Sequence, residues 1–292
     1  MSLEITFPPG TLAVVALPIG NPADLSARAV EVLRAADWVA AEDTRSVGRL
    51  LGRAGVRCRL ISYHDWNEAG RSQSLVSALQ RGERGAVVSE AGTPTISDPG
   101  YDIVRLAREQ GVRVIPIPGP SALTAFLSVS GLPTDRFTFL GFPPRKPGRR
   151  HAFFAAYSDR PETLVFYESP RRILAALTQA LEVFGDRPCA LGREMTKTYE
   201  EFLFAPLRGV LAELESRETI RGEICWGIAG APTHSPSSSA DAVFQTAKDL
   251  LARDLTPKEA AKELARMCGL GTKDAYQVLR KVRDAKSPAK AP

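Results

Sequence analysis

Short apolar runs alternate with helical patterns over the first 120 residues of the chain. Apolar runs, bounded mostly by Gly, Pro or polar residues, predict strands at 12–17, 38–41, 59–62, 86–89 and 112–117. Helical spacing predicts helices at 25–36 and 99–110, the second capped by Asp98 and ended by Gly111. Strands that alternate with helices are typical of a parallel sheet with helices on both faces.

A cluster of prolines and a glycine interrupts this pattern and predicts a domain boundary near Pro133. The segment 116–120 is followed by a short helix and then by Gly131-Leu-Pro133. Beyond the boundary a helix is predicted at 169–184, and strands are predicted at 137–142, 163–167, 188–193, 201–204 and 223–229. We therefore expect one α/β subdomain at 1–133 and a second at 134–232.

The composition changes after this second subdomain. Residues 232–239 are polar and rich in Ser, which predicts a linker. The pattern over 240–285 is helical throughout, with a capping box at 256–259 and a Gly-containing turn at 269–271 before the last helix. Two short helices around such a turn resemble a helix-turn-helix. We expect a C-terminal helical domain at 240–285 and a disordered tail at 286–292.

Composition and charge narrow the class of protein. The chain has 292 residues, 44% of them hydrophobic, and no apolar stretch approaches the ~20 residues of a membrane helix, so we expect a cytoplasmic protein. The four cysteines form no CxxC pair and the three histidines have no metal-ligand spacing, so no metal is predicted. A net charge of +5 allows an anionic partner such as nucleic acid without requiring one.

Three loops at predicted strand ends are candidates for ligand binding. Ligands of open α/β sheets bind beyond the carboxyl ends of the strands, and glycine there lets the backbone approach a ligand. The loops span 16–22, 89–101 and 116–123. Each alone fits a plain turn, but their coincidence favours a site, in which Ile96 could pack on an adenine or cap the core. The chain has no GxGxxG, which argues against a dinucleotide-binding fold.

Charged residues follow several of the same strands. Glu42 and Asp43 are candidate proton acceptors, and Arg45 is a candidate phosphate partner. The alternative is a helix N-terminus, where acids stabilise the helix dipole and Asp43 provides a cap. Lys197 and its charged neighbours at 192–199 have the same placement, with a solvated rim as their alternative.

Several longer runs together identify a family. The chain contains LPIGN, AEDTR, SEAGTPTISDPGY, PIPGPSA, FLGFPPRK, FYESPRRI and REMTKTYEE, in this order between residues 12 and 230. They resemble the motifs of the tetrapyrrole methylase superfamily. AEDTR and FYESP resemble its branch of small-subunit ribosomal RNA cytidine 2′-O-methyltransferases, rather than the porphyrin branch.

The resemblance implies a two-domain tetrapyrrole-methylase-like α/β fold (class III methyltransferase) that binds S-adenosyl-L-methionine in the cleft between its domains. It also implies a homodimer that acts on 16S rRNA of the small ribosomal subunit. Carried over by motif, the cofactor contacts, largely backbone ones, are Pro18, Gly20, Ser89, Glu90, Ala91, Gly92, Thr93, Ile96, Ser97, Ser121, Ala122, Phe166, Tyr167 and Glu168. Glu90 stands where Asp is common in the family.

Methylation of a ribose hydroxyl needs alignment and benefits from a base, because the hydroxyl is a weak nucleophile. Glu42 or Asp43 is the expected base, and Arg45 and Lys197 would hold phosphate or ribose. The basic C-terminal helices, with Lys273, Arg280, Lys281 and Arg283, are expected to hold RNA through its phosphates.

Two other functions fit parts of the pattern. A tetrapyrrole- or precorrin-type methyltransferase would use the same cofactor cleft, but it leaves the basic C-terminal domain unexplained. A DNA-binding regulator would use the helix-turn-helix, but it leaves the charged residues at the strand ends without a role.

Overall fold

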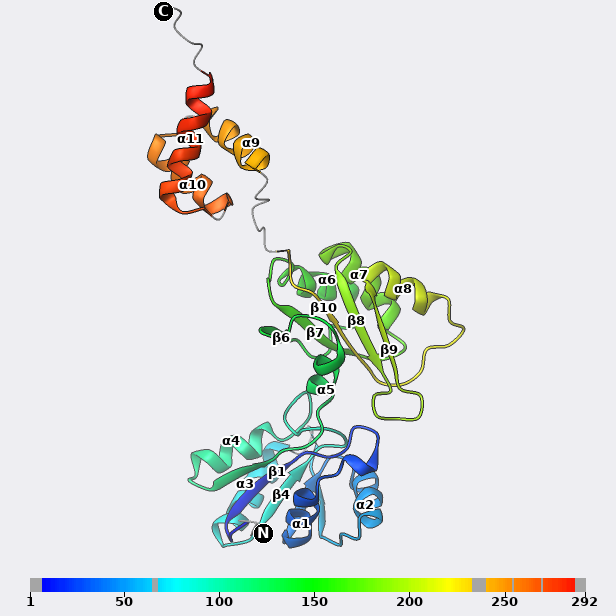
Figure 1. Ribbon diagram of the computed structural model, residues 1–292. Helices are drawn as coiled ribbons and strands as arrows, with labels where there is room; N and C mark the ends of the chain where they lie inside the picture. The colour runs from blue at the N-terminus through cyan, green and yellow to red at the C-terminus, as the bar shows by residue number, and fades with distance from the viewer. Residues whose placement is uncertain (1–6, 65–67, 233–239, 254, 269, 287–292) are drawn as a thin grey trace, which may run out of the picture. The chain divides into compact units, whose positions relative to one another are not determined.

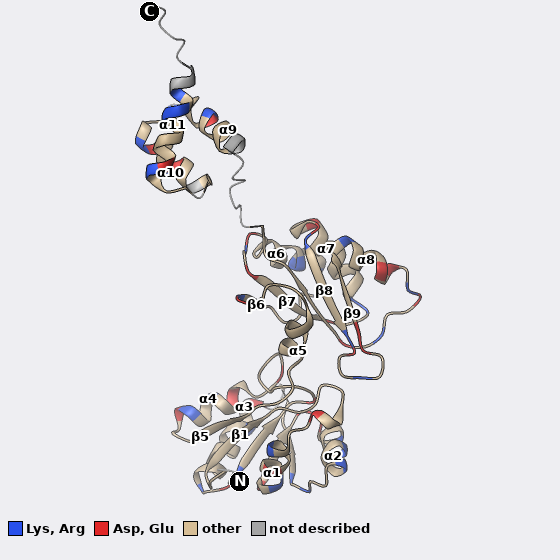
Figure 2. Cartoon of the chain, in the orientation of Figure 1, with Lys and Arg blue, Asp and Glu red and all other residues tan. Residues whose placement is uncertain are grey.

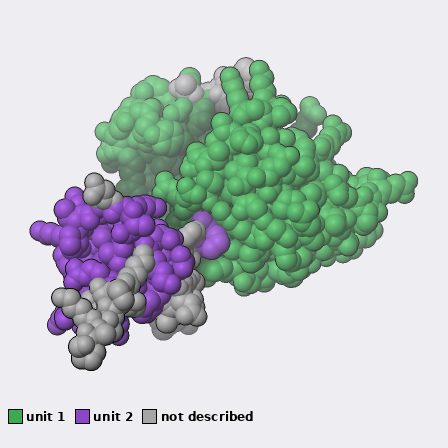
Figure 3. Space-filling view, turned by 90° about the horizontal axis from the view of Figure 1, so that it is seen from above, with its two compact units in different colours: residues 1–229 green, residues 230–292 purple. Residues whose placement is uncertain are grey.

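The computed structural model describes residues 7–64, 68–232, 240–253, 255–268 and 270–286 (Figure 1). It divides into two compact units, residues 1–229 and 230–292, coloured green and purple in Figure 3. Most of the predicted linker, 233–239, and the predicted tail beyond Lys286 lie outside the described residues. No helix among the described residues is long and apolar enough to cross a membrane.

The first sheet is parallel throughout and has the strand order β3-β2-β4-β1-β5. Its strands are β1 (Thr11–Val15), β2 (Trp38–Ala41), β3 (Leu60–Ser62), β4 (Gly85–Val88) and β5 (Arg113–Ile117). Its helices are α1 (Ala27–Ala35), α2 (Thr44–Arg53), α3 (Glu68–Gln80) and α4 (Tyr101–Glu109), and a short 3-10 helix, η1 (Pro22–Asp24), follows β1. The predicted parallel α/β arrangement is confirmed here.

Successive side chains of these strands enter two different cores. Ala13, Val39 and Ala86 pack with α1 and α2, whereas their neighbours pack with α3 and α4 on the other face. Side chains of a strand alternate between faces, so a sheet buried on both faces needs continuous apolar runs. This explains why the inner strands β1, β2 and β4 have no polar alternation.

The second sheet is mixed, with the order β6-β7-β10-β8-β9. Its strands are β6 (Phe137–Phe139), β7 (Thr163–Glu168), β8 (Pro188–Arg193), β9 (Glu201–Pro206) and β10 (Ile224–Ile228). Only β6 and β7 pair in parallel; β10 is antiparallel to β7 and β8, and β8 is antiparallel to β9. The predicted strands are found, although the first is shorter than predicted.

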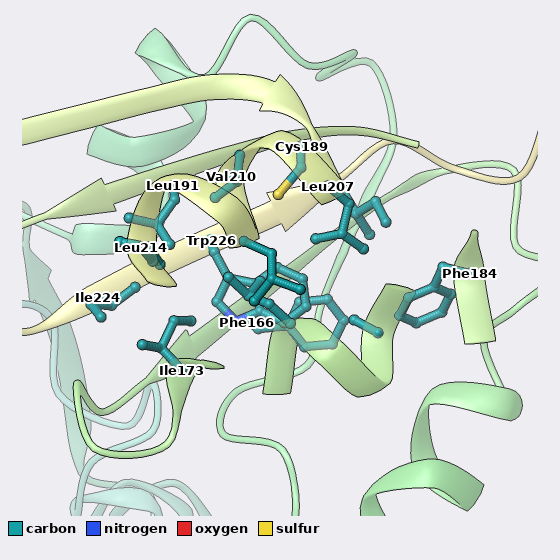
Figure 4. Packing of buried hydrophobic residues seen from close by; sticks show 14 of the residues in the cluster. Phe166, Ile173, Phe184, Cys189, Leu191, Leu207, Val210, Leu214, Ile224 and Trp226 are labelled. Atoms are coloured by element: carbon teal, nitrogen blue, oxygen red, sulfur yellow. The ribbon is translucent and has the colours of Figure 1, made fainter. Parts of the chain in front are cut away.

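Aromatic side chains form the core on one face of this sheet, beneath α6 (Pro147–Ala155), α7 (Ile173–Phe184) and α8 (Leu207–Glu215). Phe166 stacks on Trp226 with ring centroids 4.4 Å apart, and Figure 4 shows both among Ile173, Leu191 and other apolar side chains. Helix α5 (Ala122–Val129) packs on the opposite face. Helix α5 precedes Pro133 in the sequence, yet it packs on the second sheet. The subdomain boundary near Pro133 therefore stays a prediction.

Two predicted helix starts are wrong. Helix α4 begins at Tyr101, and Gly100 rather than Asp98 is its N-cap residue. Helix α7 begins at Ile173, because residues 169–172 form a turn in which the Ser169 carbonyl accepts from Arg172 N and Ile173 N. Arg172 is also held by an ion pair of 3.0 Å with Glu168, so the charged residues fix this turn rather than the helix.

The C-terminal unit contains α9 (Ala240–Leu251), α10 (Pro257–Cys268) and α11 (Thr272–Lys286) around a small core of its own. The predicted capping box is confirmed: Thr256 N donates to Glu259 Oε2 over 2.9 Å, and Glu259 N donates to Thr256 Oγ1 over 3.3 Å. The helical character of this part of the chain is therefore as predicted.

Candidate active site

A cavity of about 670 Å³ lies within the first unit, between loops of the two sheets. Its walls come from the loops after β1, β2, β4, β5, β6 and β8, from α2, from the end of β7 and from the start of β10. Its lining includes Pro18, Gly20, Glu42, Arg49, Arg53, Glu90, Ala91, Gly92, Thr93, Ile96, Ser97, Asp98, Ser121, Ala122, Phe142, Tyr167, Glu168, Met195, Lys197, Glu223 and Cys225. The cavity has the size of an ordinary small-molecule site.

Strand direction brings these residues together. All strands of the first sheet run the same way, so the loops at their carboxyl ends share one edge. In the second sheet Ile224, the first residue of β10, lies opposite Glu168 at the end of β7 and Arg193 at the end of β8. The start of an antiparallel strand thus joins the ends of its two neighbours at the cavity.

The loop after β4 has a backbone that few residues adopt. Thr95 and Ser97 have φ of 74° and 65°, and Gly92 and Gly100 also have positive φ. Left-handed backbone at residues other than glycine costs free energy and persists where surrounding contacts impose it. Gly92 exchanges two backbone hydrogen bonds with Leu17, of 2.9 and 3.0 Å, and Thr93 Oγ1 donates to the Pro120 carbonyl. The loop is therefore held by its neighbours after β1 and β5.

A residue distant in sequence caps the helix that follows this loop. Glu68 Oε1 accepts hydrogen bonds from Gly100 N at 3.0 Å and Asp102 N at 2.9 Å, and also from the Tyr63 hydroxyl. A carboxylate at a helix N-terminus satisfies free N–H groups and stabilises the helix dipole. With this cap supplied by Glu68, Asp98 is left to line the cavity.

The loops of the two sheets meet at Gly20. A Cβ atom at this position would lie 2.5 Å from Lys197 Cγ and 2.7 Å from Thr196 Oγ1. Asn21 N donates to the same Thr196 Oγ1, and Lys197 Nζ lies 2.9 Å from Glu194 and 3.0 Å from Glu223. Glycine at position 20 is thus required by close approach rather than by a turn.

Five carboxylates line the cavity: Glu42, Glu90, Asp98, Glu168 and Glu223. Burial, reinforced by the negative charge of Glu42, raises the pKa of Asp98 to about 6, against the opposing effect of a Ser89 hydrogen bond. Asp98 can therefore exchange a proton near neutral pH. Reading the sequence missed this residue, because Ser-Asp-Pro before a helical pattern fits a local cap equally well.

The four predicted catalytic residues are divided by the structure. Glu42 and Lys197 line the cavity, whereas Asp43 and Arg45 do not. Asp43 is the N-cap of α2, where its Oδ1 accepts from Arg45 N at 2.8 Å and Ser46 N at 3.2 Å, and these bonds lower its pKa. The helix-capping alternative thus describes Asp43, and Arg45 is exposed on the first turn.

All the predicted cofactor contacts line the cavity except Ser89 and Phe166. Ser89 is buried, and its hydroxyl lies within hydrogen-bonding distance of the Ala91 and Gly92 carbonyls. Phe166 is buried in the aromatic core beside Trp226. We infer that both side chains support the cavity wall from behind. Four further lining residues were not predicted from the sequence: Arg49, Arg53, Phe142 and Glu223. The two arginines could have been found from their spacing of four residues, whereas Phe142 and Glu223 have no such signal in the sequence.

The chemistry of this lining fits S-adenosylmethionine. The cofactor carries a sulfonium and an ammonium cation, for which the carboxylates of the cavity are suitable partners. Ile96, 39% exposed within a polar loop, offers an apolar surface to an adenine ring. Gly92, which also lines the cavity, carries no side chain that would cover its backbone. No group of three or more His, Cys, Asp or Glu in the described part of the chain is arranged to hold a metal ion.

Comparison with solved structures places the fold. The chain is similar to uroporphyrin-III-C-methyltransferase from Thermus thermophilus, with a TM-score of 0.54, 20% identity, and 75% of this chain and 94% of that one covered. It is also similar to cobalt precorrin-4 methyltransferase, with a TM-score of 0.56, 13% identity and the same coverages. At these identities the likeness concerns the fold alone.

Comparison with sequences places the family. Proteins named ribosomal RNA small subunit methyltransferase I from Mesorhizobium japonicum and Escherichia coli O157:H7 are each 43% identical; the alignments cover 94% and 92% of this chain and 92% and 94% of theirs. The protein of that name from Mycobacterium tuberculosis is 41% identical over 96% of this chain and 98% of its own. The family model "Tetrapyrrole (Corrin/Porphyrin) Methylases" matches residues 11–211, and the chain therefore belongs to the tetrapyrrole methylase family.

Proposed function

We propose that this protein transfers a methyl group from S-adenosyl-L-methionine to a ribose 2′-hydroxyl of a cytidine in 16S rRNA of the small ribosomal subunit. The observation that carries the proposal is the identity of 41–43% to proteins named ribosomal RNA small subunit methyltransferase I. Their alignments span at least 270 residues and cover at least 92% of this chain, whereas the first unit has only 229 residues. The alignments therefore extend into the C-terminal unit.

The same comparison disfavours a small-molecule substrate. The porphyrin and precorrin methyltransferases are at most 20% identical and cover 75% of this chain. The family model itself ends at residue 211, before the C-terminal unit begins. A substrate that explains the whole chain must therefore give the C-terminal helices a role, and RNA does.

The cavity would bind the cofactor through the loops after β1, β4 and β5. When bound, S-adenosylmethionine supplies an electrophilic methyl group on its sulfonium. The chain then has to hold the ribose hydroxyl in line and accept its proton. Glu42, which lines the cavity, is the proton acceptor we favour, because the Asp43 carboxylate is engaged by two backbone N–H groups.

Lys197 and Asp98 complete this arrangement. Lys197 lines the cavity and is held by Glu194 and Glu223, so its ammonium group is positioned to bind ribose or phosphate oxygens. Asp98 lines the same cavity, and the negative charge of Glu42 contributes to its raised pKa.

The C-terminal unit would bind RNA through exposed cations of α11. Lys273, Lys281 and Arg283 are exposed, while Ala275, Leu279 and Val282 face the core of this unit. Such contacts bind phosphates without reading the sequence. We further propose a homodimer and a cytoplasmic location, the first from the family resemblance and the second because assembling ribosomal subunits are found there.

The experiment is methyl transfer to small ribosomal subunits from a strain that lacks this protein. Labelled S-adenosylmethionine, the purified full chain and the subunits are incubated, and the RNA is digested to nucleosides. We expect label in 2′-O-methylcytidine, and none with subunits from the parent strain, which are already modified. A protein that binds the cofactor but labels neither subunits nor their extracted RNA contradicts the proposal and returns the small-molecule alternative.

A further inference from the structure

Three arginines occupy one face of α2. Arg45, Arg49 and Arg53 are spaced by four residues, so they follow one another along the helix at intervals of about 6 Å. All three are exposed, whereas Val47 and Leu51 pack into the core on the opposite face. Figure 2 shows these arginines in blue along α2.

The stability of the helix does not explain this arrangement. Like charges four residues apart destabilise a helix by roughly 0.2–0.5 kcal/mol for each pair. A cation in the first turn is also unfavourable beside the positive end of the helix dipole, and only Arg53 in the last turn is favourably placed. Helix α2 therefore tolerates Arg45 and Arg49 at a cost in free energy.

Nor are the arginines used to fold the chain. Within the described residues none of the three forms an ion pair with a carboxylate. The Asp43 carboxylate, which feels the charges of Arg45 and Arg49, has its Oδ1 engaged by the backbone. The stripe leads to the candidate active site, because Arg49 and Arg53 line the cavity with Ser46 and Leu50. It presents cations at the cavity's mouth.

We propose that Arg45, Arg49 and Arg53 form a track for the phosphates of the RNA strand that carries the target nucleotide. The proposal rests on the proposed function and names the partner of this surface. Arginine binds phosphate oxygens through two parallel N–H donors, and a row of evenly spaced arginines suits a backbone that repeats its charge. The target ribose would then enter the cavity beside Glu42 while its neighbours stay on α2.

A regularly charged strand fits this surface better than the cofactor does. The cofactor has a single carboxylate, which does not account for a row of three guanidinium groups, and Arg45 lies outside the cavity lining. The wall of the cavity also includes Phe142, 53% exposed and edge-on to Tyr167, which offers a ring on which a base can stack. The residues around the cavity therefore include a partner for each part of a nucleotide.

The test compares two double variants of the full chain that remove the same charge. Arg49→Gln/Arg53→Gln removes two arginines of the track, and Arg28→Gln/Arg34→Gln removes two exposed arginines of α1, which do not line the cavity. Affinity for small-subunit RNA extracted from a strain lacking the protein is measured between 50 and 200 mM salt. S-adenosylmethionine affinity is measured by calorimetry, and the folding of each variant is followed by thermal unfolding.

We expect the track variant to bind RNA about 10-fold more weakly than the α1 variant. The slope of log affinity against log salt should fall by about 1.4, since each phosphate contact to single-stranded RNA contributes ~0.7. The KM for subunits should rise, and the loss of RNA affinity should be larger than any loss of cofactor affinity. If the two variants have equal RNA affinities and slopes while the wild-type protein methylates RNA, the track proposal is wrong and the proposed function is unaffected.

Two other outcomes also decide against it. If the track variant loses cofactor affinity and keeps RNA affinity, the arginines belong to the cofactor site. If the wild-type protein neither binds nor methylates RNA, the proposed function fails and the track fails with it. Lower thermal stability in the track variant would contradict the argument that these arginines do not stabilise α2.

Discussion

The two sheets of the first unit reach the same cavity in different ways. The first sheet is parallel, so every loop at its carboxyl edge is available, and four of them line the cavity. The second sheet is largely antiparallel, and it reaches the cavity through the end of β7, the loops after β6 and β8, and the start of β10. The first sheet therefore supplies most of the lining, and the second supplies one wall.

The cores of the two sheets also differ in the types of side chain that fill them. Most core residues on both faces of the first sheet are aliphatic, with Trp38 and Tyr63 as aromatic members of one face, whereas Phe154, Phe166, Phe184 and Trp226 cluster on one face of the second. A parallel sheet collects loops at one edge by its topology alone. An antiparallel sheet has to place each wall residue by the packing of its own strand, which makes the aromatic core important for the site.

The largest effect should come from the edge of the first sheet. Glu42→Gln removes the proton acceptor and should lower kcat by roughly 10²–10⁴-fold while cofactor affinity changes less than twofold. Asp43→Asn is the matched control, since Asn caps a helix as well as Asp does. Single-turnover methyl transfer to small subunits measures both. If Asp43→Asn loses as much activity as Glu42→Gln, the assignment of Glu42 as the proton acceptor is contradicted.

The next largest effect tests the core of the second sheet. Trp226 is fully buried against Phe166, so Trp226→Ala should lower the free energy of unfolding by about 3–5 kcal/mol. Phe166→Leu should lower it by about 1–1.5 kcal/mol and leave cofactor affinity unchanged, because this side chain lies in the core. Urea unfolding and calorimetry provide the readouts. A Phe166→Leu variant that is stable but binds the cofactor poorly would restore Phe166 as a direct contact.

A smaller effect is expected where the loops of the two sheets meet. Gly20→Ala brings a Cβ atom to 2.5 Å from Lys197 Cγ, so the second loop must move away and cofactor affinity should fall by about 10-fold. Gly52→Ala is the control: an added Cβ at this position of α2 meets nothing within 4 Å, and it should stabilise the helix by ~0.5–1 kcal/mol. Equal cofactor affinities for both variants would mean that the loops can separate without consequence.

The smallest effect concerns Asp98 and depends on pH. Its folded pKa of about 6 lies above the ordinary aspartate value of 3.8, so the folded state binds more protons and the free energy of unfolding falls as the pH rises through this window. Asp98→Asn removes this fall and should stabilise the protein by about 1 kcal/mol at pH 7.5, after allowance for partial exposure, and not at all below pH 4. Thermal unfolding against pH measures it, with Asp135→Asn, at an exposed carboxylate, as control. A gain that is the same at every pH contradicts the assignment.

The strands of the first sheet could be predicted from the sequence because burial on both faces leaves a continuous apolar run. The loops after them could also be predicted, since Pro, Gly and small polar residues gather there. Helix α3 was missed because the pattern of its segment, EAGRSQSLVSALQ, is too polar to show a clear apolar stripe. Its packing against α4 and the sheet, rather than its own pattern, holds it in place.

The site could be predicted only as far as its parts are local. The loops at 16–22 and 89–101 supplied most of the correct lining residues, because each carries several of them in sequence. Glu223 and Cys225 reach the cavity only because β10 runs antiparallel to β7 and β8, and strand direction is not written in a single strand. Asp43 was a candidate base because a capping carboxylate and a catalytic one look the same in a sequence.

The cap that Glu68 places on α4 has a consequence for how such chains can diverge. One carboxylate oxygen accepts from Gly100 N, Asp102 N and the Tyr63 hydroxyl, so the start of α4 and the segment after β3 both depend on one side chain. A relative that loses the acid at position 68 leaves two N–H groups of the loop beside the cavity without a partner. We expect such relatives to carry a Ser, Thr or Asn near position 99 or 100 in compensation, so that substitutions at two sites 32 residues apart are inherited together.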